Sequence, residues 1–308
     1  MSVELAGLAL AHPVINGSGT FDAIAAHDAF GEDLIAAFPF AAYVSKTITL
    51  QPRAGNPPPR LWETASGLIN SIGLPNRGLA GYVEHDLPRL ARICASARTV
   101  AAAEPGVPLI TNVMGATAEE LCELVAACEQ RAEIAAVELN VSCPNVSTGL
   151  DIGADPEQLR AVVAAVRPRT RKPLIVKLTP NTADVPSCAL AAEDGGADAV
   201  SLINTLRAAA LAPARRSRSG ERWLGGGSGG LSGAAIRTIA LAQVAAVAER
   251  VAIPVVGMGG IATARHARDF LDAGATAVAV GTESFRDPTS AARVADGLMS
   301  VAGVELCE

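Results

Sequence analysis

Aromatic residues are scarce in this sequence. They account for 3% of its 308 residues, whereas hydrophobic residues together account for 50%. A chain of this composition must build its core from Ala, Val, Leu and Ile, the side chains that fill the interior of parallel β/α barrels. So high a hydrophobic content also excludes disorder as the main state.

Long apolar runs are missing as well. No run approaches the roughly 18 residues that cross a bilayer, and Met1-Ser2-Val3-Glu4 lacks the basic start of a secretory signal. We therefore expect a cytoplasmic protein without a membrane partner. Positive charge is in deficit, because the net charge is −6. A nucleic-acid partner is therefore not expected, and the predicted ligand is a small molecule.

Metal-binding patterns are absent too. The sequence has no C-x-x-C pair and no ferredoxin-like spacing among its six cysteines, which are Cys94, Cys122, Cys128, Cys143, Cys188 and Cys307. We therefore predict no zinc site and no iron–sulfur cluster in this chain. Apart from Cys143, the cysteines are expected to be reduced, buried and hydrophobic in character.

Short apolar runs alternate with helical patterns about eight times, which is the rhythm of a closed parallel barrel. We predict a single domain over residues 1–308, folded as a (β/α)8 TIM barrel with long βα loops over its C-terminal face. The expected strands are 14–16, 43–46, 109–113, 136–139, 174–178, 199–203, 255–257 and 277–280. The expected helices include 118–127, 156–166, 235–248 and 264–271.

Two local signals refine this outline. Pro156 and Pro288 suit the first turn of a helix, with Asp155 and Asp287 before them as caps. Two connections, 51–76 and 206–232, are unusually long, and loops of that length in a compact domain are usually lids or binding loops.

Polar residues and glycines follow the predicted strands. They are Gly17-Ser18-Gly19, Lys46-Thr47, Asn112, Asn140 with Cys143, Lys177, Asn204-Thr205, Gly259-Gly260 and Gly281-Thr282. Polar residues often end strands for solvation alone, but barrel active sites are assembled from this rim. Only three of the 25 basic residues are lysine, and two of those three follow strands, where an ammonium suits a carboxylate or a developing anion.

The last two glycine turns predict a phosphorylated ligand. They follow the seventh and eighth strands, where barrels commonly bind a phosphate through backbone N–H groups, with a favourable dipole from a following helix. Cys143 is the rim residue best suited to take up a proton near neutral pH.

In this order, the motifs resemble those of the class 1 dihydroorotate dehydrogenases, the soluble FMN enzymes of pyrimidine biosynthesis. The resemblance covers essentially the whole chain. It rests on Asn16-Gly17-Ser18-Gly19-Thr20, Ser45-Lys46-Thr47, Asn70-Ser71-Ile72-Gly73-Leu74-Pro75-Asn76, Asn140-Val141-Ser142-Cys143-Pro144-Asn145, Val176-Lys177-Leu178-Thr179-Pro180-Asn181, Ile203-Asn204-Thr205, Gly229-Gly230-Leu231-Ser232-Gly233, Gly257-Met258-Gly259-Gly260 and Val280-Gly281-Thr282.

The resemblance implies roles for these residues. The flavin would be lined by Ser18, Lys46, Thr47, Asn112, Asn140, Lys177, Ile203 and Gly233, with its phosphate on Gly259, Gly260, Gly281 and Thr282. The substrate would be held by Lys46, Asn70, Ser71, Ile72, Gly73, Leu74, Asn140, Asn204 and Thr205. Cys143 would be the general base that takes a proton from C5 of dihydroorotate while C6 gives a hydride to the flavin, and Lys177 would stabilise the reduced flavin.

Two subtypes of this family fit different motifs. The Ile203-Asn204-Thr205 and 229–233 segments resemble the B type, which works with a separate subunit that carries FAD and an iron–sulfur cluster and passes electrons to NAD. Leu74-Pro75-Asn76 is closer to the fumarate-using A type, and the arginine-rich loop 207–222 departs from the short hairpin expected there. We favour the B type. The resemblance also implies a homodimer, or a heterotetramer with the electron-transfer subunit.

Three other functions remain as alternatives. A dihydropyrimidine dehydrogenase-like barrel would act on uracil or thymine, which lack a carboxylate for Lys46. A tRNA dihydrouridine synthase would also use FMN and a cysteine, but the acidic charge disfavours it. A non-catalytic barrel acting as a binding module would stay colourless with FMN.

Overall fold

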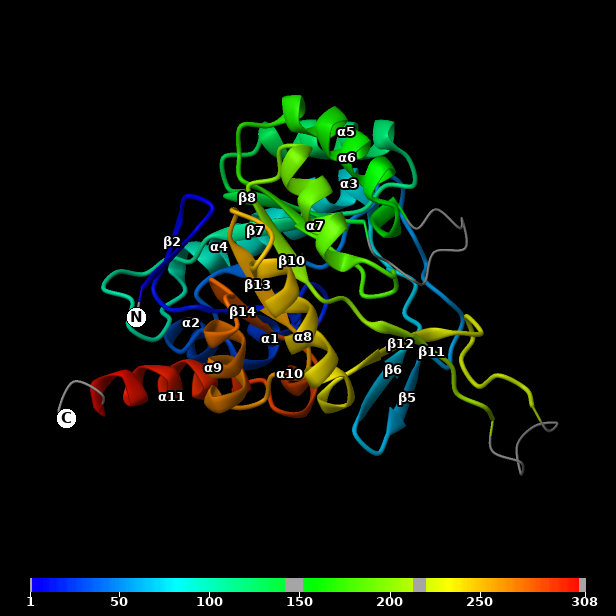
Figure 1. Ribbon diagram of the computed structural model, residues 1–308. Coiled ribbons are helices and arrows are strands. Elements are labelled where there is room, and N and C mark those ends of the chain that lie inside the picture. The colour runs from blue at the N-terminus through cyan, green and yellow to red at the C-terminus, as the bar shows by residue number, and fades with distance from the viewer. Residues whose placement is uncertain (1, 142–151, 213–219, 305–308) are drawn as a thin grey trace.

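Eight parallel strands form the centre of the computed structural model, which describes residues 2–141, 152–212 and 220–304, the side chains of 301–304 excepted (Figure 1). They follow one another in the order β3-β14-β13-β10-β9-β8-β7-β4. Their bounds are β3 Val14–Asn16, β4 Tyr43–Val44, β7 Leu109–Val113, β8 Ala136–Asn140, β9 Leu174–Lys177, β10 Ala199–Leu202, β13 Val255–Met258 and β14 Ala277–Val280. The (β/α)8 barrel is confirmed, with all eight strands at their predicted positions.

Asn16 joins the two ends of this sheet, β3 and β4. Its Nδ2 donates to the carbonyl of Val44 at 2.8 Å, and its Oδ1 accepts from the amide of Val44 at 2.7 Å. An asparagine side chain offers the same donor and acceptor as a peptide group. The side chain of Asn16 therefore takes the place of a backbone pair between β3 and the two-residue strand β4.

Helices surround the strands (Figure 1). They are α1 Ala23–Phe30, α2 Glu32–Ala36, α3 Gly78–Gly81, α4 Leu87–Ser96, α5 Ala118–Glu129, α6 Pro156–Val166, α7 Val185–Asp194, α8 Arg237–Ala248, α9 Ala264–Asp272, α10 Glu283–Arg286 and α11 Ser290–Val304, with a π-helical turn at Tyr82–Asp86 and 3₁₀ turns at Ile152–Ala154, Arg167–Arg169 and Ala234–Ile236. Within the described ranges, no helix combines the length and the hydropathy needed to span a bilayer.

The two predicted helix starts have different outcomes. Asp155 caps α6 as predicted, because its carboxylate accepts from the amide of Glu157 at 2.9 Å and Pro156 is the first helical residue. The prediction for Pro288 is wrong by two residues, because α11 begins at Ser290. Asp287 instead accepts from the amide of Thr289 at 2.8 Å, in a turn that precedes the helix.

The barrel interior has its own apolar cluster. Ile110, Ile175 and Val256 fill it from three strands, and Leu5 and Leu10 pack against them. These two leucines belong to an N-terminal hairpin of β1 (Val3–Leu5) and β2 (Leu8–Leu10), which the sequence analysis did not predict. The hairpin therefore covers apolar surface that the barrel alone would leave open.

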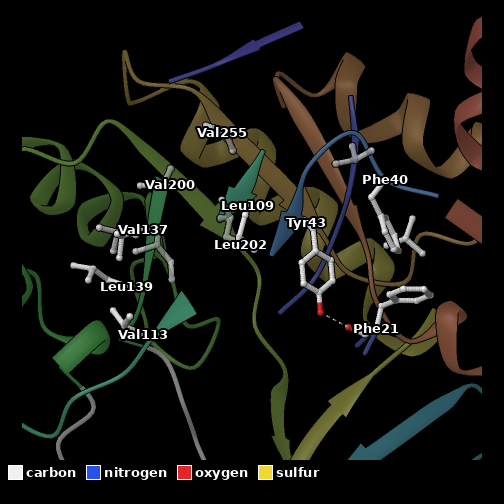
Figure 2. Close-up of a cluster of buried hydrophobic side chains, with 14 of the residues drawn as sticks. Phe21, Phe40, Tyr43, Leu109, Val113, Val137, Leu139, Val200, Leu202 and Val255 are labelled. Atoms are coloured by element: carbon white, nitrogen blue, oxygen red, sulfur yellow. Dashed lines mark hydrogen bonds between the residues drawn. The ribbon is translucent and has the colours of Figure 1, made fainter. Parts of the chain in front are cut away.

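A second cluster lies between the strands and the helices, and Figure 2 shows part of it. The scarce aromatic residues are concentrated there. Phe21 and Phe40 meet edge to face with ring centroids 5.1 Å apart, and Phe38 meets both of them in the same way. The hydroxyl of Tyr43 donates to the carbonyl of Phe21 at 3.0 Å (Figure 2). The other side chains that the figure labels are Leu and Val.

The buried cysteines behave as core residues, as predicted. Cys94, Cys128 and Cys188 are buried and Cys122 is half-buried, whereas Cys307 lies outside the described residues. Burial raises the pKa of Cys94 to about 12, because a thiolate would lose its hydration there. The thiol of Cys94 therefore stays protonated at neutral pH.

The two long connections correct the expectation of loops, because each contributes two strands to one antiparallel sheet. Its order is β11-β12-β6-β5, with bounds β5 Leu61–Thr64, β6 Gly67–Asn70, β11 Leu206–Ala208 and β12 Gly229–Ser232. Figure 1 shows this sheet to one side of the barrel. Trp62 and Trp223, the only two tryptophans of the chain, meet beside it with ring centroids 5.8 Å apart.

His12 should make stability fall on the acid side of neutrality. The side chain is fully buried, with Nε2 2.7 Å from the hydroxyl of Thr99. Burial lowers the pKa of His12 from 6.5 to about 4. Between these two pH values the unfolded state binds more protons than the folded state, so the free energy of unfolding decreases as the pH is lowered. The expected loss at pH 5 is about 2 kcal/mol. Urea unfolding of the parent and of His12→Asn at pH 7.5 and pH 5 checks this. The difference between their free energies of unfolding should be smaller at pH 5 by that amount, and an equal difference at both pH values would contradict the prediction.

Candidate active site

A cavity of about 550 Å³ opens at the C-terminal ends of the barrel strands. Its floor comes from residues that end or follow strands of the barrel, and one wall comes from the antiparallel sheet. The lining residues are Gly17, Ser18, Gly19, Thr20, Lys46, Thr47, Leu61, Leu68, Asn70, Ile72, Leu74, Asn140, Lys177, Ile203, Asn204, Thr205, Ser232, Gly233, Ile236, Met258, Gly259, Gly260, Ala279, Gly281, Thr282 and Phe285.

Most residues predicted from the strand ends meet in this one cavity. Of the predicted site residues that the structure describes, all but three line the cavity. The lining ones are Ser18, Lys46, Thr47, Asn70, Ile72, Leu74, Asn140, Lys177, Ile203, Asn204, Thr205, Gly233, Gly259, Gly260, Gly281 and Thr282. Cys143, the predicted base, lies outside the described residues. Strand β8 ends at Asn140, three residues before it.

Three predicted residues do not line the cavity. Asn112 is fully buried, and its Nδ2 donates to the carboxylate of Glu138. Ser71 donates from its hydroxyl to the carbonyl of Ser228 at 2.7 Å. Gly73 has a φ of +75°, and a Cβ there would lie 2.5 Å from the backbone nitrogen of Asn56. Ser71 and Gly73 therefore set the path of the chain that presents Ile72 and Leu74.

Hydrogen bonds fix the polar side of the cavity. The hydroxyl of Ser18 donates to the carbonyl of Ser45 at 2.8 Å and lies 3.3 Å from the hydroxyl of Thr47. The same threonine accepts from Nδ2 of Asn140 at 3.3 Å. Amide and hydroxyl groups from β3, β4 and β8 are thus held together before any ligand binds.

The two cavity lysines sit in different surroundings. Lys177 ends β9 and is only 6% exposed. Lys46 is exposed and follows β4. One buried and one exposed ammonium, on different strand ends, give the cavity two separate positive groups, each suited to a different anionic part of a ligand.

The glycine turns form a cradle that suits a phosphate. Gly260 has a φ of +69°, and a Cβ there would lie 2.6 Å from the carbonyl of Gly233. The hydroxyls of Thr282 and Ser232 lie 2.8 Å apart at the same end. The helix after β14 is only the four-residue α10, so backbone N–H and hydroxyl groups, rather than a long helix dipole, are the features that fit an anion here.

Sequence reasoning found Ile72, Leu74 and Ile203 but missed the rest of the apolar lining. Met258 is the last residue of β13, and strand alternation places it on the same face as the interior residue Val256. Leu61 and Leu68 reach the cavity from the antiparallel sheet, and Phe285, 60% exposed, reaches it from α10. The alternation in β13 was available in the sequence. The three others depended on the unpredicted sheet and on the position of a short helix.

No histidine lines the cavity, although all four lie in the described ranges. Within those same ranges, no three His, Cys, Asp or Glu side chains come together in a group that could hold a metal ion.

A parallel barrel, a cavity at the strand ends and a glycine cradle define a (β/α)8 protein whose C-terminal face carries a cavity suited to a phosphorylated ligand. A sequence profile of one family, described as dihydroorotate dehydrogenase, matches residues 1–302. This chain belongs to the dihydroorotate dehydrogenase family.

Individual relatives agree with the family profile. The chain is 45% identical over 301 residues to the dihydroorotate dehydrogenase B (NAD(+)) catalytic subunit of Desulforudis audaxviator, covering 96% of this chain and 91% of that protein. It is 44% identical to the protein of the same name from Geobacter sulfurreducens, covering 96% and 90%. Among solved structures, it resembles the Eimeria tenella enzyme in complex with ferulenol, with a TM-score of 0.79, 25% identity and coverage of 98% and 85%.

Proposed function

We propose that this chain oxidises (S)-dihydroorotate to orotate, a step of pyrimidine biosynthesis, with FMN bound in the cavity. One observation carries the proposal: most of the residues that the family resemblance assigns to flavin and substrate converge on a single cavity, although they are spread from Ser18 to Thr282. The cavity volume of about 550 Å³ is within the range of cofactor sites. When bound, FMN supplies the hydride acceptor.

The chain's own residues then have distinct tasks. The cradle of Gly259, Gly260, Gly281 and Thr282 holds the phosphate through backbone N–H and hydroxyl groups. Lys46 pairs with the carboxylate of the substrate, and the amides of Asn70, Asn140 and Asn204 bind its ring. Lys177 stabilises negative charge from the cavity floor. Cys143 accepts the proton that leaves C5 of dihydroorotate.

We further propose that the chain works as the catalytic subunit of a B-type enzyme. The names of the relatives from Desulforudis audaxviator and Geobacter sulfurreducens support this. The partner would be an electron-transfer subunit with FAD and an iron–sulfur cluster, because the six cysteines here have no cluster spacing. The assembly of this chain into a homodimer or a heterotetramer stays a prediction, and so does its cytoplasmic location.

The segment that favours the A type has a structural explanation. Asn76 accepts from the amide of Gly78 at 2.8 Å and donates from Nδ2 to the carbonyl of Leu74 at 2.8 Å. Its Oδ1 also accepts from the amide of Thr49 at 3.3 Å. Asn76 therefore holds the turn that presents Leu74, so a structural role accounts for this residue in the present chain.

Anaerobic mixing of the purified yellow protein with dihydroorotate tests the function. The flavin absorbance should bleach with dihydroorotate and stay unchanged with dihydrouracil, which lacks the carboxylate for Lys46. Bleaching by dihydrouracil alone would favour the dihydropyrimidine dehydrogenase-like alternative. Fumarate and NAD are then added separately. Fumarate should not restore the colour of the isolated chain, and NAD should do so only with the electron-transfer subunit present. Rapid reoxidation by fumarate would identify an A-type enzyme.

A further inference from the structure

The barrel buries one acidic and one basic side chain among the described residues. Glu138 of β8 is 3% exposed and Lys177 of β9 is 6% exposed, whereas every other described Asp, Glu, Lys and Arg is at least partly exposed. Lys177 lines the cavity, and Glu138 does not. Burying a carboxylate is costly unless other groups compensate it. A role for Glu138 is therefore to be sought in the groups that it contacts.

The strand register places Glu138 inside the barrel beneath the cavity. Asn140 lies opposite Lys177 on the neighbouring strand and lines the cavity. Side chains two residues apart on a strand share a face, so Glu138 points into the same interior, one layer further from the rim. There its Oε1 accepts from the hydroxyl of Ser201 on β10 at 2.7 Å, and its Oε2 accepts from Nδ2 of Asn112 on β7.

These two hydrogen bonds place the carboxylate of Glu138 beside the base of Lys177. Strand β9 lies between β8 and β10, and Ser201 is the residue opposite Lys177 on β10. To reach Ser201, the side chain of Glu138 must cross β9 on its interior face, next to the base of Lys177. The carboxylate thus links β7, β8 and β10 on the interior face of the barrel, beside the base of Lys177.

The same carboxylate fixes the orientation of the Asn112 amide. An ionised carboxylate only accepts hydrogen bonds, so it selects the nitrogen end of the amide. The oxygen end, Oδ1, is buried and has no hydrogen-bond partner within the described part of the chain. A buried acceptor left unpaired is unfavourable, and it marks a place where a ligand N–H or a water completes the site.

We propose that Glu138 is a positioning residue for flavin chemistry: it orients Asn112 as an acceptor and offsets the charge of Lys177 beneath the ring. This rests on the proposed function. With a neutral side chain at position 138, less negative charge lies near the cofactor, and reduction of the cofactor adds negative charge. Glu138→Gln should therefore favour the reduced flavin. Glutamine keeps the network, because its oxygen can accept from Asn112 while its nitrogen donates to Ser201.

Redox titration of the FMN-loaded protein with dithionite tests the proposal without using dihydroorotate. Glu138→Gln should raise the ratio of affinities for reduced and oxidised FMN about tenfold, which for a two-electron couple is a shift of about 30 mV to a more positive potential. The matched control is Glu129→Gln, which neutralises a hydrogen-bonded carboxylate whose partners are Thr170 and Arg171, far from the cavity lining. It should leave the potential unchanged. Equal potentials in Glu138→Gln and the parent would overturn the role of Glu138.

A second variant covers a Glu138→Gln protein that does not fold. Ser201→Ala keeps the charge of Glu138 but removes one of its two donors, and it should weaken FMN binding about fivefold to tenfold, the cost of one buried hydrogen bond. Unchanged affinity, measured by quenching of FMN fluorescence, would overturn the positioning role. A parent that binds FMN but is not reduced by dihydroorotate would contradict the proposed function instead, and the comparison of potentials would still decide the role of Glu138.

Discussion

Cys143→Ala is expected to retain FMN and to slow flavin reduction by dihydroorotate about 10²-fold to 10⁴-fold, the usual contribution of a positioned general base. Strand β8 ends at Asn140, three residues before Cys143 in the sequence, and barrel enzymes place their chemistry at the C-terminal ends of their strands. No histidine lines the cavity to take over the task. Because the thiolate is the active form of a cysteine base, the parent rate should rise with pH through one apparent ionisation, and this rise should disappear in the variant.

Anaerobic stopped-flow reduction, followed at the flavin absorbance, measures this effect. Cys122→Ala is the matched control, because Cys122 lies on α5 with its thiol 3.3 Å from the carbonyl of Ala165 and does not line the cavity. The control should reduce its flavin at the parent rate. If Cys143→Ala reduced its flavin as fast as the parent, the assignment of the base would be wrong.

The barrel could be predicted because its strands carry their own signal. Parallel strands covered by helices are apolar on both faces, so runs such as Val255–Met258 and Ala277–Val280 stand out from the sequence around them. The antiparallel sheet gives no such signal. Its central pairing joins Asn70 to Gly230, residues 160 positions apart in the sequence. That pairing is decided by the barrel, which brings the two long connections to the same end.

The candidate site divides in the same way. Residues directly after a strand, such as Lys46 and Thr205, could be placed at the rim because the ends of parallel strands share one edge. Depth within the barrel could not be predicted. Asn112 was expected at the cavity and lies in the layer beneath it, bonded to Glu138. Glu138 falls within the strand predicted over 136–139. The sequence does not show how its charge is accommodated, because the hydrogen bonds that do so come from neighbouring strands. The single-domain organisation over 1–308 stays a prediction.

Lys177→Met is expected to retain a folded barrel and to slow flavin reduction by dihydroorotate about 10²-fold to 10³-fold, the usual cost of removing one preorganised group that stabilises developing negative charge. Lys177 reaches the cavity from the end of β9 and is buried. Methionine keeps much of the volume of the lysine stem and removes only the ammonium. The flavin potential should become more negative, opposite in sign to the effect expected for Glu138→Gln.

The opposite signs allow one combined test. Lys177→Met leaves the carboxylate of Glu138 buried beneath a neutral side chain, whereas adding Glu138→Gln removes that negative charge as well. The double variant should therefore regain part of the flavin potential and of the stability lost in Lys177→Met, but not the rate, because no ammonium remains at the cavity floor. Lys172→Met is the control: Lys172 donates to the carbonyls of Arg131 and Ile134 at 2.8 and 2.6 Å, away from the cavity. It should lower stability without changing the reduction rate of bound flavin. A parent-like rate in Lys177→Met would remove Lys177 from the chemistry and leave it a structural role alone.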